Sequence, residues 1–172
     1  RSRRSEHGGS LAWRKFRRHR AALFGLVVFA LIAVASFAAP WLSPYQPNKI
    51  DILARNQVPS AEHVLGTDGT GRDVATRLLY AGRVSLTVAV LAVALAAVIG
   101  IVIGSLSGYF GGAVDTVLMR LTDTVMSVPM VIIAIALVAV LGPSLRNVIV
   151  LFGVLGWPAM ARIVRAQFLT YR

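Results

Sequence analysis

The chain has 172 residues, of which 56% are hydrophobic and only 15% are charged, and its mean hydropathy is +0.71. This composition excludes an ordinary soluble domain and indicates a membrane protein. The net charge is +11, but 8 of the 18 Lys and Arg residues lie within the first 20 positions, so the positive charge is local and a nucleic-acid-binding module is disfavoured.

The first predicted element is a basic N-terminus, residues 1–20, and a first transmembrane helix follows over residues 21–39. At 1.5 Å per residue this uncharged run spans about 28 Å, which is close to the thickness of the hydrocarbon core. A secretory signal also begins with basic residues before an apolar run, but its apolar core is typically about 7–15 residues and this run is longer. Lys and Arg resist translocation, so we expect residues 1–20 to be cytoplasmic.

An extracytoplasmic loop, residues 40–83, is predicted next, with 5 basic and 4 acidic residues. The second predicted transmembrane helix covers residues 84–107, an uncharged run of about 36 Å that can cross the bilayer with some tilt. Small residues recur at every fourth position along it, which predicts a face for close packing against another helix. These residues are Ala92, Ala96, Gly100, Gly104 and Gly108.

A cytoplasmic loop, residues 108–113, leads to a third predicted transmembrane helix over residues 114–141, whose start carries Asp115, Arg120 and Asp123. An ionisable group in hydrocarbon costs several kcal/mol unless it is paired or hydrated. Arg120 and Asp123 have the spacing of a local ion pair on one helix face, and a role in lining or gating a pathway is the alternative. Pro129 removes one helical hydrogen bond, which predicts a kink.

An outer turn, residues 142–144, precedes a fourth predicted transmembrane helix over residues 145–161, and residues 162–172 are predicted to start a cytoplasmic segment. Its cations, Arg162, Arg165 and Arg172, either anchor the chain at lipid headgroups or form a docking surface for a soluble partner. The sequence begins with Arg1 and not Met, and it ends within no recognisable element, so we expect it to be a piece of a longer chain.

Several kinds of site are excluded by their missing motifs. The sequence contains no P-loop, so any ATP chemistry must belong to a partner. The Gly-rich run at residues 66–73 has the wrong glycine spacing for a dinucleotide and too few acidic ligands for calcium. There is no cysteine, and His7, His19 and His63 have no second ligand at metal-binding spacing, so no metal site is predicted. No nucleophile elbow is present, so no catalytic residue is predicted.

Four segments, taken in order, resemble one family. They read VLGTDGTGRD with LLYAGRVSL (64–73 and 78–86), GYFGGAVD with Met119, Arg120 and Asp123 (from 108), LGP (141–143), and GWP (156–158) with Ala161, Arg162 and Arg165. This combination resembles the C-type permease subunits of dipeptide, oligopeptide and nickel ABC importers. Ala81-Gly82 stands where Gly-Ala is the commoner order in that family.

The resemblance implies an all-α, polytopic membrane helix bundle of the type I ABC importer class, with four transmembrane helices visible of an expected six. It implies alternating access driven by ATP, a homologous permease subunit as partner, two cytoplasmic ATPase subunits that bind ATP and Mg, and an extracytoplasmic binding protein. This chain would bind no cofactor itself and would lie in a bacterial inner membrane. Di- and oligopeptides are the favoured substrates, nickel or another small solute is the second candidate, and a membrane anchor or assembly subunit is the third.

The predicted site residues form three sets. The resemblance places the start of the ATPase-coupling segment near the end of the chain, so the predicted ATPase contacts are Arg162, Arg165, Tyr171 and Arg172. Polarity and position suggest a translocation path along Asp123, Met126, Pro129 and Asn147. The third set is the face of small residues from Ala92 to Gly108, which is predicted to touch another helix.

Overall fold

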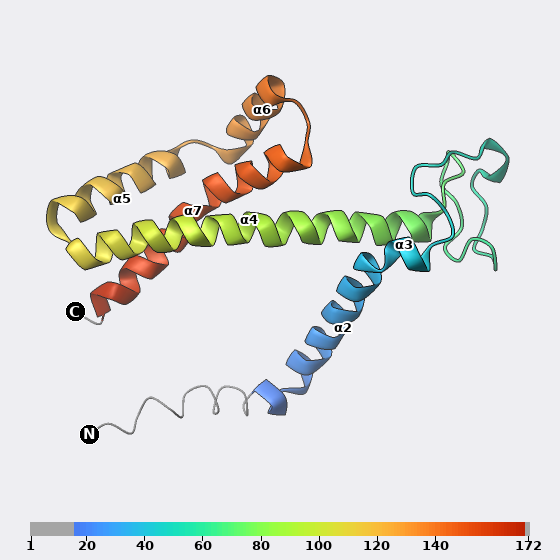
Figure 1. Cartoon of the computed structure of the whole chain (residues 1–172), viewed down its shortest axis with the longest axis horizontal. Coiled ribbons are helices and arrows are strands. Elements are labelled where there is room, and N and C mark those ends of the chain that lie inside the picture. Colours follow the sequence, from blue (N-terminus) through green and yellow to red (C-terminus); the bar gives the residue numbers. More distant parts are fainter. Residues whose placement is uncertain (1–15, 171–172) are drawn as a thin grey trace. The chain divides into compact units, whose positions relative to one another are not determined.

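The computed structural model describes residues 16–170, and the regular structure of these residues is helical (Figure 1). The extended pairing found among them is one isolated bridge between Thr67 and Asp73. The prediction of an all-α chain is therefore confirmed over the described residues. In chain order the helices are α2 (Arg20–Phe37), α3 (Ala39–Leu42), the 3-10 turn η1 (Ile52–Ala54), α4 (Val74–Phe110), α5 (Gly112–Ser127), α6 (Met130–Leu141) and α7 (Leu145–Thr170).

The chain divides into two compact units within α4, after Ser85. The first unit contains α2, α3, η1, the long loop and the beginning of α4. The second contains the remainder of α4 together with α5, α6 and α7.

In the first unit, α2 is an apolar helix with most of its side chains exposed. The Nδ1 atom of His19 caps its first turn by accepting a hydrogen bond from the Ala22 N–H at 3.2 Å. Pro40 follows its end and, having no N–H, cannot extend the helical hydrogen bonding. Phe24 and Val34 are 72% and 67% exposed. An apolar surface of this kind requires lipid or neighbouring helices around it.

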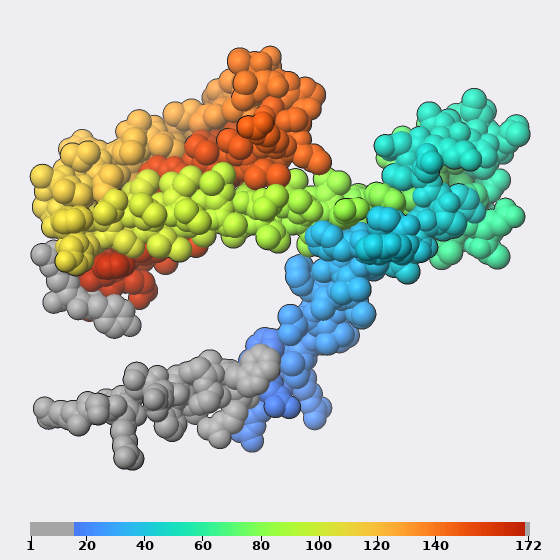
Figure 2. Space-filling view, viewed as in Figure 1, coloured from blue at the N-terminus to red at the C-terminus, as the bar shows by residue number. Residues whose placement is uncertain are grey.

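The loop of residues 43–73 folds into a compact lobe, which the space-filling view shows in cyan and teal (Figure 2). The Thr67 hydroxyl donates to the carbonyl of Ala54 and accepts from the N–H of Gln57 at 2.8 Å. Gly71 has φ +78°, and a Cβ there would lie 1.6 Å from the Asp51 carbonyl oxygen. Only glycine fits this close approach of two backbone segments.

The helix α4 begins ten residues before the predicted transmembrane segment. Asp73 precedes it and accepts a hydrogen bond from the N–H of Thr76 at 2.6 Å, which caps the first turn. Residues 74–83, which were predicted to lie in the extracytoplasmic loop, are therefore part of α4. Gly111 and Gly112, with φ of 65° and 52°, end the helix and turn the chain into α5.

The predicted third transmembrane helix is divided into α5 and α6, which are bent by 77° at their junction. Val128 is extended there, with φ −91° and ψ 125°, and Pro129 precedes the first residue of α6. The kink expected at Pro129 within residues 114–141 is thus a full break in the helix, because Pro129 disfavours helical geometry at the preceding residue. By contrast, α7 runs without interruption through Pro158, so no boundary separates the predicted fourth helix from residues 162–170.

Candidate translocation and coupling site

The contact between α4 and α7 is built on glycines of α4. A Cβ at Gly100 would lie 2.6 Å from the Cβ of Met160 and 2.9 Å from the carbonyl oxygen of Trp157. A Cβ at Gly104 would lie 2.5 Å from the carbonyl oxygen of Ala161. Real Cβ atoms do not approach this closely, so hydrogen at these positions is what allows the two backbones to meet.

The same contact extends in both directions along the two helices. A Cβ at Gly108 would lie 2.5 Å from the Cβ of Phe168. At the other end α7 supplies the glycine, since a Cβ at Gly153 would lie 2.5 Å from the side chain of Leu95. The predicted face of small residues thus lies against α7, with Ala96 near Gly156 and with Ala92 buried.

The pairing along this contact shows that α4 and α7 are parallel. Gly100 lies against Met160, Gly104 against Ala161 and Gly108 against Phe168, so the residue numbers rise together in the two helices. The chain between two parallel membrane helices must return to the side on which the first one began. The bent pair of α5 and α6 is the segment that makes this return. Among residues 16–170, three helices are long and apolar enough to span a membrane, and there are four spans if the bent pair is one broken span.

Asp115, in the first turn of α5, connects three helices through its side chain. The guanidinium of Arg165 on α7 bonds both carboxylate oxygens, with Nη2 to Oδ2 at 2.5 Å. The hydroxyl of Ser107 on α4 donates to Oδ1. A bidentate Arg–carboxylate pair fixes orientation as well as distance. The Asp115 cluster, formed by Ser107, Asp115 and Arg165, therefore ties the end of α4, the start of α5 and the second half of α7 together.

A second ion pair between α5 and α7 joins Asp123 to Arg162, with Nη2 to Oδ1 at 2.5 Å. Both side chains are exposed, unlike those of the Asp115 cluster. The local pair of Arg120 with Asp123 that the sequence suggested is replaced by this contact across 39 positions. The two arginines predicted to contact an ATPase are thus engaged with α5, and the ATPase contact itself stays a prediction.

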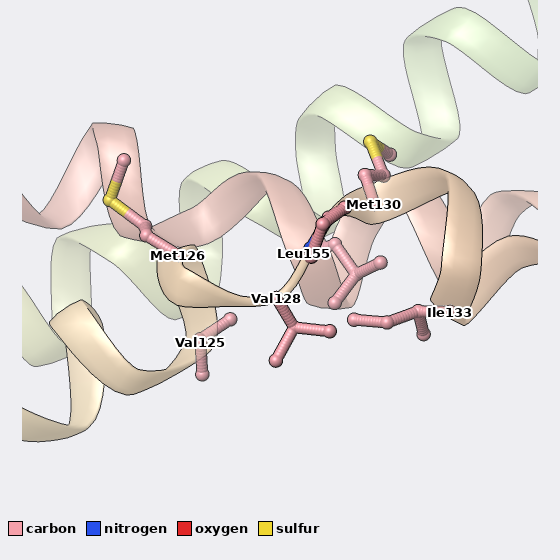
Figure 3. A pocket seen from close by; sticks show the side chains of 7 residues that line it. Val125, Met126, Val128, Met130, Ile133 and Leu155 are labelled. Atoms are coloured by element: carbon pink, nitrogen blue, oxygen red, sulfur yellow. The ribbon is translucent and has the colours of Figure 1, made fainter.

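The predicted path residues occupy three places, of which the ion pair of Asp123 with Arg162 is the first. Met126 and Pro129 line a cavity of about 230 Å³ at the break between α5 and α6 (Figure 3). The side-chain amide of Asn147 donates instead to the carbonyls of Leu141 and Gly142, at 3.1 and 2.9 Å. Asn147 therefore holds the turn between α6 and α7. The other residues that line the cavity are Val125, Val128, Met130, Ile133 and Leu155.

In the lobe of residues 43–73, Asp68 is the main acceptor. Its carboxylate accepts from the Thr70 hydroxyl at 2.6 Å, from Nε of Arg72 at 2.8 Å and from the guanidinium of Arg77. The hydrogen bonds from Thr70 and Arg72, that of the Thr70 hydroxyl first, hold the pKa of Asp68 well below its ordinary range despite partial desolvation. The Gly-rich run is therefore a turn held together by the Asp68 carboxylate.

His63 has a partner that the sequence did not indicate. Its Nδ1 atom lies 2.9 Å from Oδ2 of Asp73, ten positions later. Its ring centroid lies 4.8 Å from that of Tyr45, and the two ring planes are tilted by 31°. Burial raises the pKa of Asp73, but hydrogen bonds from Thr76 and His63 lower it more, so it ends below its ordinary value. Among the described residues no cluster of three or more His, Asp or Glu side chains can hold a metal ion.

We expect Asp68→Asn to loosen the lobe, because an amide cannot serve as anionic acceptor for Arg72 and Arg77. Limited proteolysis of the purified protein at neutral pH should cut residues 43–73 of this variant several-fold faster than those of wild type.

The stabilisation by the Asp68 carboxylate is fully present above its ordinary pKa of 3.8 and is lost as the pH falls through the lower pKa of the folded state. Wild-type cleavage rates should therefore not change between pH 5 and 8 through this group. Glu62→Gln is the matched control, and equal rates for both variants would contradict the role of Asp68.

Two of the predicted ATPase contacts, Tyr171 and Arg172, lie outside the described residues, as does most of the basic N-terminus. Sequence reasoning flagged Asp115 for its charge at membrane depth but assigned it no partner. Its partner Arg165 is 50 positions away, and no local spacing indicates such a pair.

Comparison with known proteins identifies the family. Residues 9–59 match the N-terminal transmembrane domain of oligopeptide transport permease C. Residues 100–172 match the inner membrane component of binding-protein-dependent transport systems. The chain belongs to the binding-protein-dependent transport permeases. The family expected from the sequence is confirmed.

Three relatives illustrate the likeness. The permease is 40% identical over 158 residues to a peptide permease protein of Brucella abortus, and 39% identical over 158 residues to the dipeptide transport system permease protein DppC of Bacillus subtilis. It is 40% identical over 162 residues to the glutathione transport system permease protein GsiD of Pectobacterium atrosepticum. These alignments cover 92%, 92% and 93% of this chain and 52%, 49% and 54% of the relatives. The chain thus spans about half the length of the relatives it matches.

Proposed function

We propose that this permease is a membrane subunit of an ATP-driven importer for di- and oligopeptides and forms half of its translocation path. The observation that carries the proposal is the 39–40% identity, over more than nine-tenths of the chain, to proteins named for the transport of peptides, a dipeptide and glutathione. Glutathione is itself a tripeptide, so these names share one substrate class. The permease would break no bond, since its part is to change which side of the membrane the path opens to.

The proposed complex contains a homologous permease, two cytoplasmic ATPase subunits that bind ATP and Mg, and an extracytoplasmic binding protein. The permease would lie in the bacterial inner membrane with its N-terminus in the cytoplasm. The basic residues before α2 support this orientation, because Lys and Arg beside a transmembrane helix resist translocation. The lobe of residues 43–73 would then face outward toward the binding protein.

Coupling in this proposal runs through α7. The helix is continuous from Leu145 to Thr170, so an ATPase that displaced its cytoplasmic end would move the whole helix. The Asp115 cluster and the pair of Arg162 with Asp123 would carry that displacement into α5. A mechanism of this kind requires that the contacts with the ATPase differ between its two nucleotide states.

The proposal is tested by uptake in a strain that lacks the permease gene and carries it on a plasmid. Radiolabelled alanyl-alanine should accumulate with the plasmid and not with the empty vector, and accumulation should stop when the partner ATPase carries an inactive P-loop. Labelled glutathione measured in the same cells tests the tripeptide case. Nickel accumulation without peptide uptake would overturn the peptide assignment. A strain whose uptake is unchanged by loss of the permease would indicate a membrane anchor.

A further inference from the structure

The break between α5 and α6 places non-helical backbone between two helices that together are long and apolar enough to form a membrane segment. Ser127, Val128, Pro129 and Met130 are all exposed in the second unit. Backbone outside a helix is tolerated at membrane depth where it is covered by protein or lines a water-filled cavity. These residues are exposed within the described second unit, so in the complete importer another protein segment or the aqueous path must lie against them.

The cavity at this break has an apolar lining with flexible walls. Figure 3 shows Met126 and Met130 on either side of the break, with Val128 and Ile133 extending toward each other and Leu155 of α7 close by. Methionine is unbranched and polarisable, and it adapts to ligands of different shape at promiscuous surfaces. Met126 and Met130 both line this cavity, and two methionines suit an occupant whose shape varies.

The contact of α4 with α7 shows how the same chain builds a fixed helix contact. There the residues are glycines, and the backbones approach until no Cβ fits at Gly100 or Gly104. At the break, by contrast, apolar side chains with no glycine among them surround an open volume of about 230 Å³. Pockets for drug-sized ligands measure about 300–1,000 Å³, so this cavity suits one side chain and not a whole peptide.

We propose that the cavity at the break between α5 and α6 is a subsite for an apolar side chain of the transported peptide. This inference rests on the proposed function and adds a substrate preference to it. The side chain of a leucine-containing peptide would be buried against Val128, Ile133 and Leu155 as it passes the break. The peptide backbone would lie toward the aqueous path.

The test compares the uptake of alanyl-leucine with that of alanyl-alanine in cells that express the complete importer. Leu155→Phe and Val128→Phe fill the cavity, and each should lower the uptake ratio of alanyl-leucine to alanyl-alanine by about tenfold, since a methylene group in an apolar pocket is worth about 10–200-fold. The binding protein is the same in every strain, so its own preference cancels in the comparison. Val131→Phe, on the exposed surface of α6 outside the cavity lining, is the control and should leave the ratio unchanged.

A second variant and a direct readout guard against misfolding. Met126→Ala enlarges the cavity and should raise the relative uptake of alanyl-tryptophan. A dipeptide with a photoreactive leucine analogue should crosslink to residues 125–133 in wild type and not in Val128→Phe. An unchanged uptake ratio, or crosslinks only to lipid or to residues other than 125–133 and Leu155, would overturn the subsite. If wild type carries neither dipeptide, the proposed function fails; if it carries both and the filled variants discriminate as wild type does, only the subsite fails.

Discussion

Gly104→Leu is expected to separate α4 from α7 and to lower the amount of assembled permease in the membrane by about tenfold or more. A Cβ at this position would lie 2.5 Å from the carbonyl oxygen and 3.1 Å from the Cα of Ala161, and 2.8 Å from the Cβ of Val164. Two of these atoms belong to the α7 backbone and cannot rotate away. Overpacking a well-packed contact costs about 1–3 kcal/mol even for small additions, and leucine adds four carbons. Immunoblots of membranes and size-exclusion profiles of the solubilised importer provide the measurement.

Variants at two other glycines provide comparisons for Gly104→Leu. Gly25→Leu, in α2, is the matched control, because nothing lies within 4 Å of a Cβ there, and its membrane level should equal that of wild type. Gly156→Ala should have a small effect, since its Cβ would meet that of Ala96 at 3.3 Å. Wild-type levels and full peptide uptake for Gly104→Leu would show that the two helices do not need this close approach.

The apolar runs of the sequence were sufficient to predict α2, α4 and the membrane part of α7, but not where these helices end. The length of an apolar run reflects the thickness of the bilayer, whereas the end of a helix is set by its hydrogen bonds and caps. Thus α4 starts at Val74, where Asp73 caps it, and α7 continues through residues 162–170. Both extensions are polar enough to leave the hydrocarbon and therefore carry no hydropathy signal.

The break at Pro129 could have been predicted more sharply. Proline removes one helical hydrogen bond, and a kink was expected at Pro129 for that reason. The stronger effect acts on the preceding residue, whose helical geometry is disfavoured by the proline ring. Val128 is accordingly extended, and the two helices are bent by 77°. The signal was present in the sequence, and only its size was underestimated.

The partners of the charged residues could not be read from the sequence. The spacing of Arg120 and Asp123 favoured a pair on one helix face, yet Asp123 pairs with Arg162 of α7. Likewise, the four-residue repeat from Ala92 to Gly108 predicted a packing face but not that α7 would occupy it in parallel. Pairings between helices depend on how the chain returns across the membrane, and in this permease the return is made by the broken α5–α6 segment.

Asp115→Asn is expected to reduce peptide uptake by about tenfold or more, whereas Asp123→Asn should reduce it by less than about threefold. Both variants remove one carboxylate charge from α5 and leave an arginine of α7 unpaired. The difference lies in their surroundings, because Asp115 and Arg165 are partly buried and joined by two hydrogen bonds, while Asp123 and Arg162 are exposed. Hydrogen bonds to charged groups contribute about 1.5–3 kcal/mol, but exposed ion pairs contribute about 0–1 kcal/mol.

Further variants separate the fork geometry of Arg165 from its charge. Arg165→Lys keeps the charge but cannot bond both carboxylate oxygens, so its uptake should fall between those of wild type and Arg165→Ala. The exchange of Asp115→Arg with Arg165→Asp should restore only part of the activity, since it places a cation in the first turn of α5, where the helix dipole favours an anion. Equal losses for Asp115→Asn and Asp123→Asn at equal membrane levels would mean that burial does not distinguish the two pairs. The Asp115 cluster would then not be the contact that carries movement of α7 into α5.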